Sequence, residues 1–181
     1  TNISNPLSKL NLSGQTNISG ERSNLDAFKS EAISSGFKCS ELNVSHAFHS
    51  PEMNPMISEF ETMLKGIKFS SSSGKMYSTV TGKRITNETE SIEYWSKQIL
   101  SPVLYKDAIC ALSEENRNLF IEIGPKPILI NLTKQILSPN PEIKVFPSIQ
   151  YQIDSEFTLL KTAQKIWAAG YPVNWKNIYK K

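Results

Sequence analysis

The sequence is poor in the residues that build metal, redox and membrane sites. It has only two histidines and two cysteines in 181 residues. Cys39 and Cys110 are too few and too far apart for the disulfide framework of a secreted domain, so we expect buried thiols in a reducing cytoplasm. No apolar run approaches the length of about 18 residues that a transmembrane helix needs, and the N-terminus lacks a signal-segment pattern. The sequence therefore predicts a cytoplasmic protein with no membrane partner.

Positive charge is not concentrated anywhere along the chain. Lys and Arg outnumber Asp and Glu by 20 to 17, which gives a net charge of +3. A nucleic-acid site requires a basic stripe or patch, so nucleic acid is not an expected partner. An apolar share of 39% with 20% charged residues is instead typical of a globular domain with a hydrophobic core.

Apolar periodicity predicts a chain of alternating strands and helices. We expect strands over residues 15–21, 37–44, 75–82, 118–125 and 143–149. We expect helices over residues 23–36, 54–66, 91–100, 103–112, 128–137 and 157–169. The first helix is expected to begin with Ser23 as its N-cap residue. Alternation of helices with apolar strands predicts an α/β fold with a mostly parallel sheet covered on both faces.

Both histidines lie in one short motif, VSHAFHS, at residues 44–50. Taken alone, His46 and His49 permit three interpretations: a structural role in a turn, a metal site, or a general base. A metal site needs further ligands, and the only acids close by in the sequence are Glu41 and Glu52. We therefore predict no metal site.

A general base must be held in one tautomer and must face a nucleophile. The motif follows the strand expected over residues 37–44, and open α/β sheets gather catalytic groups at the ends of their strands. The rigid Ser50-Pro51 step limits the freedom of this loop. The sequence contains no G-x-S-x-G, so the nucleophile elbow of hydrolases is absent. A base in the motif would act on a nucleophile from elsewhere.

The extended motif VSHAFHSPEM resembles the histidine motif of the acyltransferase domains of modular polyketide synthases, relatives of the bacterial malonyl-CoA:acyl-carrier-protein transacylase. Further similar motifs follow in the family's order, over essentially the whole chain: QTNISGE, YSTVTGK, YWSKQILSPV, FIEIGPKPIL and IWAAGYPVNWKNIY. The resemblance implies part of an α/β-hydrolase-like parallel sheet subdomain together with a partial ferredoxin-like small subdomain. It assigns residues 1–44 to the small subdomain, residues 45–149 to the large one, and residues 150–181 to a post-acyltransferase linker.

The resemblance also implies a reaction. In this family a serine attacks the thioester of an acyl-CoA, and a histidine takes the proton of that serine. The position of the histidine corresponds to His49, whose second nitrogen is expected to donate to the backbone carbonyl of Gln98 instead of a triad carboxylate. The serine, set in G-H-S-x-G, belongs to an N-terminal half that we expect to precede residue 1, so the chain alone is expected to be inactive.

The substrates follow from the same resemblance. Malonyl-CoA is the expected donor, the phosphopantetheine thiol of an acyl carrier protein is the expected acceptor, and no covalently bound cofactor is expected. In the family the tetrapeptide HAFH accompanies malonyl selection, whereas YASH accompanies methylmalonyl. We expect Phe48 to fill the space near the acyl α-carbon. His46 could shape that wall, although a purely structural role is the favoured interpretation for it. One methyl group is worth only about 1–3 kcal/mol, so the motif biases the choice of substrate.

The C-terminal segment is similar to the linker that wraps back over the ketosynthase-to-acyltransferase region. Expected partners are therefore the ketosynthase domain with that linker, through Trp167, Tyr171, Val173 and Trp175, and the N-terminal half of the acyltransferase domain. A second class of function stays open, because remnants of this domain serve as non-catalytic docking modules for a separate acyltransferase. The intact HAFHSP sequence together with Gln98 favours the enzyme.

Overall fold

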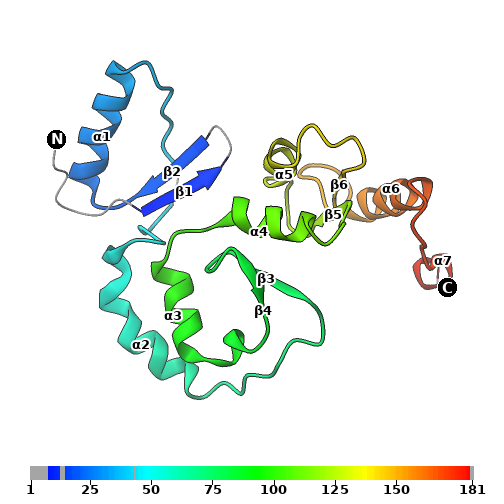
Figure 1. Ribbon diagram of the computed structural model, residues 1–181, viewed down its shortest axis with the longest axis horizontal. Helices are drawn as coiled ribbons and strands as arrows, with labels where there is room; N and C mark the ends of the chain where they lie inside the picture. The colour runs from blue at the N-terminus through cyan, green and yellow to red at the C-terminus, as the bar shows by residue number, and fades with distance from the viewer. Residues whose placement is uncertain (1–7, 13–14, 43, 180–181) are drawn as a thin grey trace. The chain divides into compact units, whose positions relative to one another are not determined.

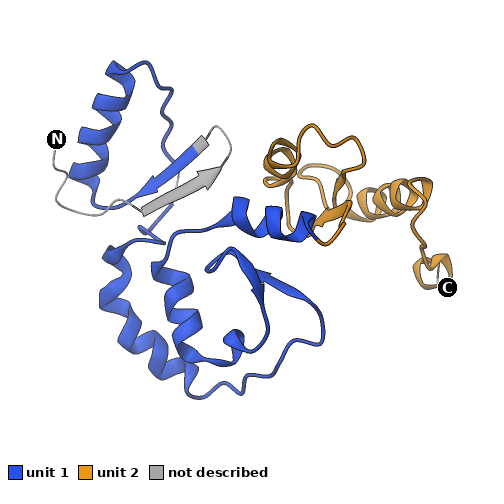
Figure 2. Ribbon diagram, viewed as in Figure 1, with its two compact units in different colours: residues 1–114 blue, residues 115–181 orange. Residues whose placement is uncertain are grey.

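The computed structural model describes residues 8–12, 15–42 and 44–179, and Figure 1 labels their helices and strands. The mixture of helices and strands confirms the predicted α/β class. The chain divides into two compact units, residues 1–114 and residues 115–181 (Figure 2). None of the helices in the described part of the chain combines the length and the hydrophobicity that crossing a membrane requires.

The elements of the first unit are β1 (Ser8–Leu12), β2 (Gln15–Ser19), α1 (Arg22–Ser34), the 3-10 helix η1 (Pro51–Met53), α2 (Asn54–Leu64), β3 (Met76–Ser78), β4 (Lys83–Ile85), the 3-10 helix η2 (Glu88–Glu90), α3 (Ile92–Leu100) and α4 (Tyr105–Ser113). Those of the second unit are β5 (Leu119–Glu122), α5 (Ile130–Ile136), β6 (Lys144–Pro147), α6 (Ser155–Ala168) and α7 (Trp175–Ile178).

Strand pairing is partly parallel. β5 and β6 pair in parallel, with Leu119 opposite Lys144, and α5 forms the crossover between them. β1 pairs with β2 and β3 pairs with β4 in antiparallel fashion. The expectation of mostly parallel pairing therefore holds for one of the three strand pairs in the described residues. The short connections within the other two pairs favour antiparallel hairpins, because a parallel crossover needs about a dozen residues or more.

The strand predicted over residues 37–44 is not formed. The described residues of this segment have no regular structure, residue 43 lies outside the described residues, and the side chain of Phe37 is 69% exposed. A strand needs a hydrogen-bonded neighbour, and no strand in the described sheets pairs with this segment. The predicted burial of Cys39 is wrong for the same reason, since its side chain is exposed, whereas Cys110 is partly buried.

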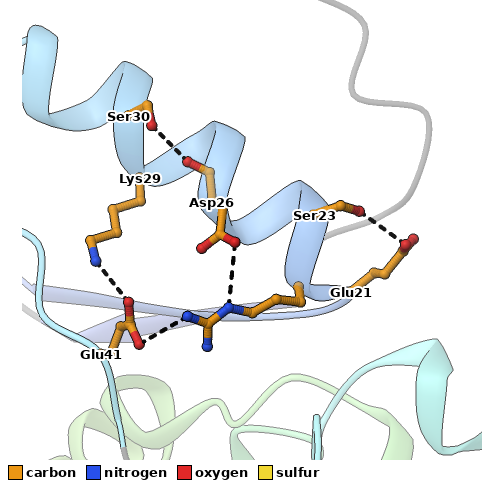
Figure 3. A network of polar contacts seen from close by, with 7 residues as sticks. Glu21, Ser23, Asp26, Lys29, Ser30 and Glu41 are labelled. Carbon is orange, nitrogen blue, oxygen red and sulfur yellow. Dashed lines mark hydrogen bonds and ion pairs between the residues drawn. The ribbon is translucent and has the colours of Figure 1, made fainter.

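Helix α1 begins before the residue predicted to cap it. Glu21 is the N-cap residue and makes no side-chain capping bond, while Ser23 already lies in the first turn. The carbonyl oxygen of Glu21 accepts the N–H of Leu25 at 3.0 Å, which is the first helical hydrogen bond. The Ser23 hydroxyl donates to the Glu21 carboxylate at 2.9 Å instead of capping the helix (Figure 3).

A network of ion pairs connects α1 to the segment that leads to the histidine motif. The Glu41 carboxylate accepts a hydrogen bond from Lys29 at 2.7 Å (Figure 3). It also pairs with Arg22 at 3.4 Å. The hydrogen bond lowers the pKa of Glu41 and raises that of Lys29. All three side chains are exposed, so the network contributes little to stability. It links the segment around Glu41 to α1.

The core of the first unit lies between its later helices and the β3–β4 hairpin. Helix α2 packs against α3, and α4 packs against β3 and β4. The residues sealed between these elements are mainly apolar: Met53, Leu64, Ile85, Tyr94, Ala108 and Ile109. Two polar contacts lie among them. Ser78 Oγ is 2.8 Å from the Tyr94 hydroxyl, and Ser96 Oγ donates to the Glu61 carboxylate at 2.8 Å. The helices predicted near residues 54–66, 91–100 and 103–112 are confirmed.

In the second unit, one carboxylate organises the turn between β5 and α5. Glu122 ends β5, and its two oxygens accept the backbone N–H groups of Ile128, Leu129 and Ile130 at 2.8–3.1 Å. These donors lie at the start of α5, where backbone N–H groups have no partner inside the helix. Helix α6 covers β6, and Thr162 donates to the Pro147 carbonyl at 2.7 Å.

We expect Glu122→Ala to lower the free energy of unfolding by about 2–3 kcal/mol, because donors at the start of α5 lose a charged acceptor. Urea denaturation measures this change. Glu142→Ala is the matched control, since it removes an exposed carboxylate of the same unit and should change stability by less than about 0.5 kcal/mol. Equal losses from the two substitutions would contradict the role of Glu122.

Candidate active site

The histidine motif forms the turn that leads into η1 and α2. His46 is exposed, His49 is half-buried, and Ser50 is completely buried. Ser50 is also the N-cap residue of η1, with its side chain accepting the N–H of Glu52 and with Pro51 at the start of the helix. A helix therefore begins directly after His49 and Ser50, which leaves the imidazole on the turn that precedes η1.

The His49 imidazole contacts the end of helix α3. Its Nδ1 lies 3.1 Å from the carbonyl oxygen of Ser101, and its backbone N–H donates to the carbonyl of Ile99 at 2.8 Å. A carbonyl oxygen only accepts hydrogen bonds, so Nδ1 must carry the proton. In the neutral ring the lone pair then lies on Nε2. This arrangement gives His49 the tautomer and the fixed orientation that a general base requires.

The acceptor is Ser101 and not Gln98, which corrects the prediction. Gln98 lies in the last turn of α3, which ends at Leu100. Pro102 offers no N–H to continue the helix and forces the preceding residue out of the helical region. Ser101 is accordingly extended, with φ −82° and ψ 152°, and its carbonyl leaves the helical ladder. The Ser101-Pro102 step is the sequence signal that identifies this acceptor.

His46 and Phe48 lie together, separate from the contacts of His49. Their ring centroids are 5.9 Å apart in an edge-on arrangement, and His46 Nδ1 is 2.9 Å from the Ser45 hydroxyl. Phe48 is 46% exposed. The predicted pair of wall residues is thus brought into contact, on a surface that is open in the described residues. Their role in substrate selection stays a prediction.

Within residues 8–12, 15–42 and 44–179, no site brings together three or more His, Cys, Asp or Glu side chains that could hold a metal ion. The arrangement around His49 contains an imidazole, two backbone carbonyls and a buried hydroxyl. Chemically it suits proton transfer to and from a neighbouring group.

Comparison with known families decides the class of the domain. A family model described as the acyl transferase domain matches residues 7–170. The chain belongs to this acyl transferase family. The resemblance found in VSHAFHSPEM and the motifs after it is therefore confirmed. The match covers the histidine turn, helices α1 to α6 and strands β1 to β6.

Similar proteins include polyketide synthases. The chain is 28% identical over 171 residues to the PKS-NRPS hybrid synthetase acdB of Aspergillus candidus, covering 93% of this chain and 7% of that protein. It superimposes with a TM-score of 0.89 and 26% identity on the acyltransferase domain from the second module of the salinomycin polyketide synthase, covering 96% of this chain and 41% of that one. For the malonyl CoA-acyl carrier protein transacylase from Clostridium perfringens the TM-score is 0.76 at 26% identity, with 92% and 52% covered.

We expect Pro102→Ala to weaken the contact that orients His49. The new N–H allows α3 to continue, which withdraws the Ser101 carbonyl from Nδ1. Loss of a hydrogen bond worth about 1 kcal/mol should shift the ratio of imidazole tautomers about fivefold toward the form with the proton on Nε2. Nitrogen-15 NMR of the ring measures that ratio. Ser101→Ala is the matched control, because it keeps the backbone carbonyl; a tautomer ratio unchanged by Pro102→Ala would refute this account.

Proposed function

We propose that the chain supplies the general base and part of the substrate wall of an acyltransferase that moves a malonyl unit from CoA to the phosphopantetheine thiol of an acyl carrier protein. Membership of the acyl transferase family supports the reaction class. The contact between His49 Nδ1 and the Ser101 carbonyl is the observation that carries the proposal, because it keeps the lone pair of the neutral ring on Nε2, where it can accept a proton.

The proposed reaction has two acyl transfers. In the first, Nε2 of His49 takes the proton of a serine hydroxyl as the serine oxygen attacks the thioester carbonyl. The tetrahedral intermediate then expels the CoA thiolate, which receives the proton from the imidazolium. In the second, His49 takes the proton of the carrier-protein thiol, whose sulfur attacks the acyl-serine ester, and returns it to the serine oxygen. The Ser101 carbonyl holds the ring in place through both transfers.

The serine must come from other residues of the acyltransferase domain, because no G-x-S-x-G occurs in the sequence. The β5–β6 pair supports such a partner. Parallel sheets are normally covered on both faces, yet Ile121 of β5 is 44% exposed and Ile123, which follows the strand, is 88% exposed. The chain spans 41% of the solved salinomycin acyltransferase domain. We propose that the remaining part of such a domain covers this face and carries the nucleophile.

The C-terminal segment is the proposed contact with a ketosynthase domain and its linker. Trp167 of α6 packs edge-on against Trp175 of α7, with ring centroids 6.4 Å apart. Trp175 stacks on Tyr179, with ring centroids 6.3 Å apart. Trp167 and Tyr179 remain exposed. Aromatic residues of this kind are enriched at protein interfaces. The subdomain boundaries at residues 44–45 and 149–150 stay predictions.

We expect His49→Ala to slow loading of malonyl groups onto a carrier protein by at least about a hundredfold in the complete domain, because general bases contribute this much or more. Stopped-flow or gel assays of acyl transfer measure the rate. The control for folding is that the His49→Ala variant and the parent domain have the same thermal unfolding temperature. If loading were unchanged, His49 would have no part in the mechanism, and the non-catalytic docking module would become the better hypothesis.

We expect Phe48→Ser to raise the relative rate with methylmalonyl-CoA by about tenfold, since a smaller side chain leaves space for one methyl group. Competition between malonyl-CoA and methylmalonyl-CoA measures the preference. Phe37→Ser removes another exposed phenylalanine outside the motif and should leave the preference as it was. A malonyl preference that survives Phe48→Ser would exclude the steric role of this side chain.

A further inference from the structure

Ser50 is a polar side chain that is sealed inside the protein. Its exposed fraction is 0%, although it directly follows the half-buried His49. Its Oγ donates to the carbonyl of Ala47 at 2.7 Å and accepts the N–H of Glu52 at 3.3 Å. Both capacities of the hydroxyl are used, and the two bonds tie together the residues before and after His49.

The backbone that Ser50 closes has an unfavourable conformation at His49. The φ angle of His49 is 63°, in the left-handed region that residues with a Cβ atom disfavour. Such a conformation persists only where the surrounding structure holds it. The hydrogen bond from the His49 N–H to the Ile99 carbonyl holds one side at 2.8 Å. The Ser50 hydroxyl spans the turn on the other side.

The direction of the imidazole depends on this backbone angle. With His49 in the ordinary extended or helical region, its Cα–Cβ bond would point elsewhere, and Nδ1 would lose the Ser101 carbonyl. The hydrogen bonds of the Ser50 side chain go to the backbone of Ala47 and Glu52 and not to the imidazole. Its influence on proton transfer therefore has to pass through the conformation of the turn.

We propose that Ser50 is a positioning residue for the acyl transfer, with its buried hydroxyl locking the left-handed turn that aims the imidazole of His49. This inference rests on the proposed function of His49 as the base. In this inference Ser50 takes no direct part in the reaction and acts only through the position of His49. Removing the hydroxyl should impair the chemical step and leave substrate binding nearly unchanged.

The test is Ser50→Ala in the complete acyltransferase domain. We expect kcat for malonyl loading to fall by at least about tenfold with KM for malonyl-CoA little changed, because small displacements of a catalytic group are costly. Nitrogen-15 NMR of His49 should show a mixture of tautomers where the parent protein shows one. Ser50→Thr, which keeps the hydroxyl, should recover part of kcat if it folds.

Ser91→Ala is the matched control for loss of a serine cap. Ser91 caps α3 by accepting the N–H of Tyr94 at 3.2 Å, so the variant should lower the unfolding temperature without changing kcat. Equal effects of Ser50→Ala and Ser91→Ala on kcat would overturn the proposal. So would a kcat for Ser50→Ala equal to that of the parent protein.

A double variant separates this inference from the proposed function. If Ser50 acts only through His49, adding Ser50→Ala to His49→Ala should leave the residual rate unchanged. A further tenfold fall in the double variant would show that Ser50 acts independently and would overturn the inference. If His49→Ala alone did not slow loading, the proposed function itself would fail. If it did and Ser50→Ala did not, only the role of Ser50 would be lost.

Discussion

The hydrogen bond between His49 Nδ1 and the Ser101 carbonyl joins two segments that are 52 residues apart in the sequence. It connects the turn after the N-terminal elements to the end of α3, and it decides which imidazole nitrogen is free to accept a proton. One such bond contributes only about 1 kcal/mol net, which is too little to fix a loop alone. The loop is also held by the Ile99 carbonyl, by the buried Ser50 and by the packing of α2 on α3.

A neutral acceptor behind the base has an energetic consequence. A carboxylate would stabilise the imidazolium more strongly, but a charged group placed at a half-buried site loses hydration that must be compensated. The Ser101 carbonyl orients the ring without bringing a charge into the site. The family relationship and this geometry are mutually consistent.

Local patterns in the sequence predicted the helices well, and the non-local contacts poorly. Helix α3 has its apolar face, its Ser91 cap and its terminating proline within one short stretch, so each of these signals is readable. The segment 37–44 has the alternation of a strand, but a strand exists only with a partner, and pairing is a property of distant residues. The acceptor of His49 is a different case. The resemblance placed it at Gln98, whereas Pro102 gives Ser101 the extended backbone that takes its carbonyl out of the helix, a local signal that the resemblance did not use.

The two proposed tasks of the histidine motif differ in what they require from the rest of the domain. The orientation of His49 is complete within contacts of the first unit, from the turn at Ser50 to the Ser101 carbonyl. Discrimination between substrates by Phe48 is not complete within these contacts, because a side chain that is 46% exposed excludes little volume by itself. A methyl group is rejected at a cost of about 1–3 kcal/mol only where close packing prevents the wall from moving aside. The orientation of the base is therefore fixed by contacts within the first unit, whereas selection of a substrate by Phe48 requires packing that these contacts do not supply.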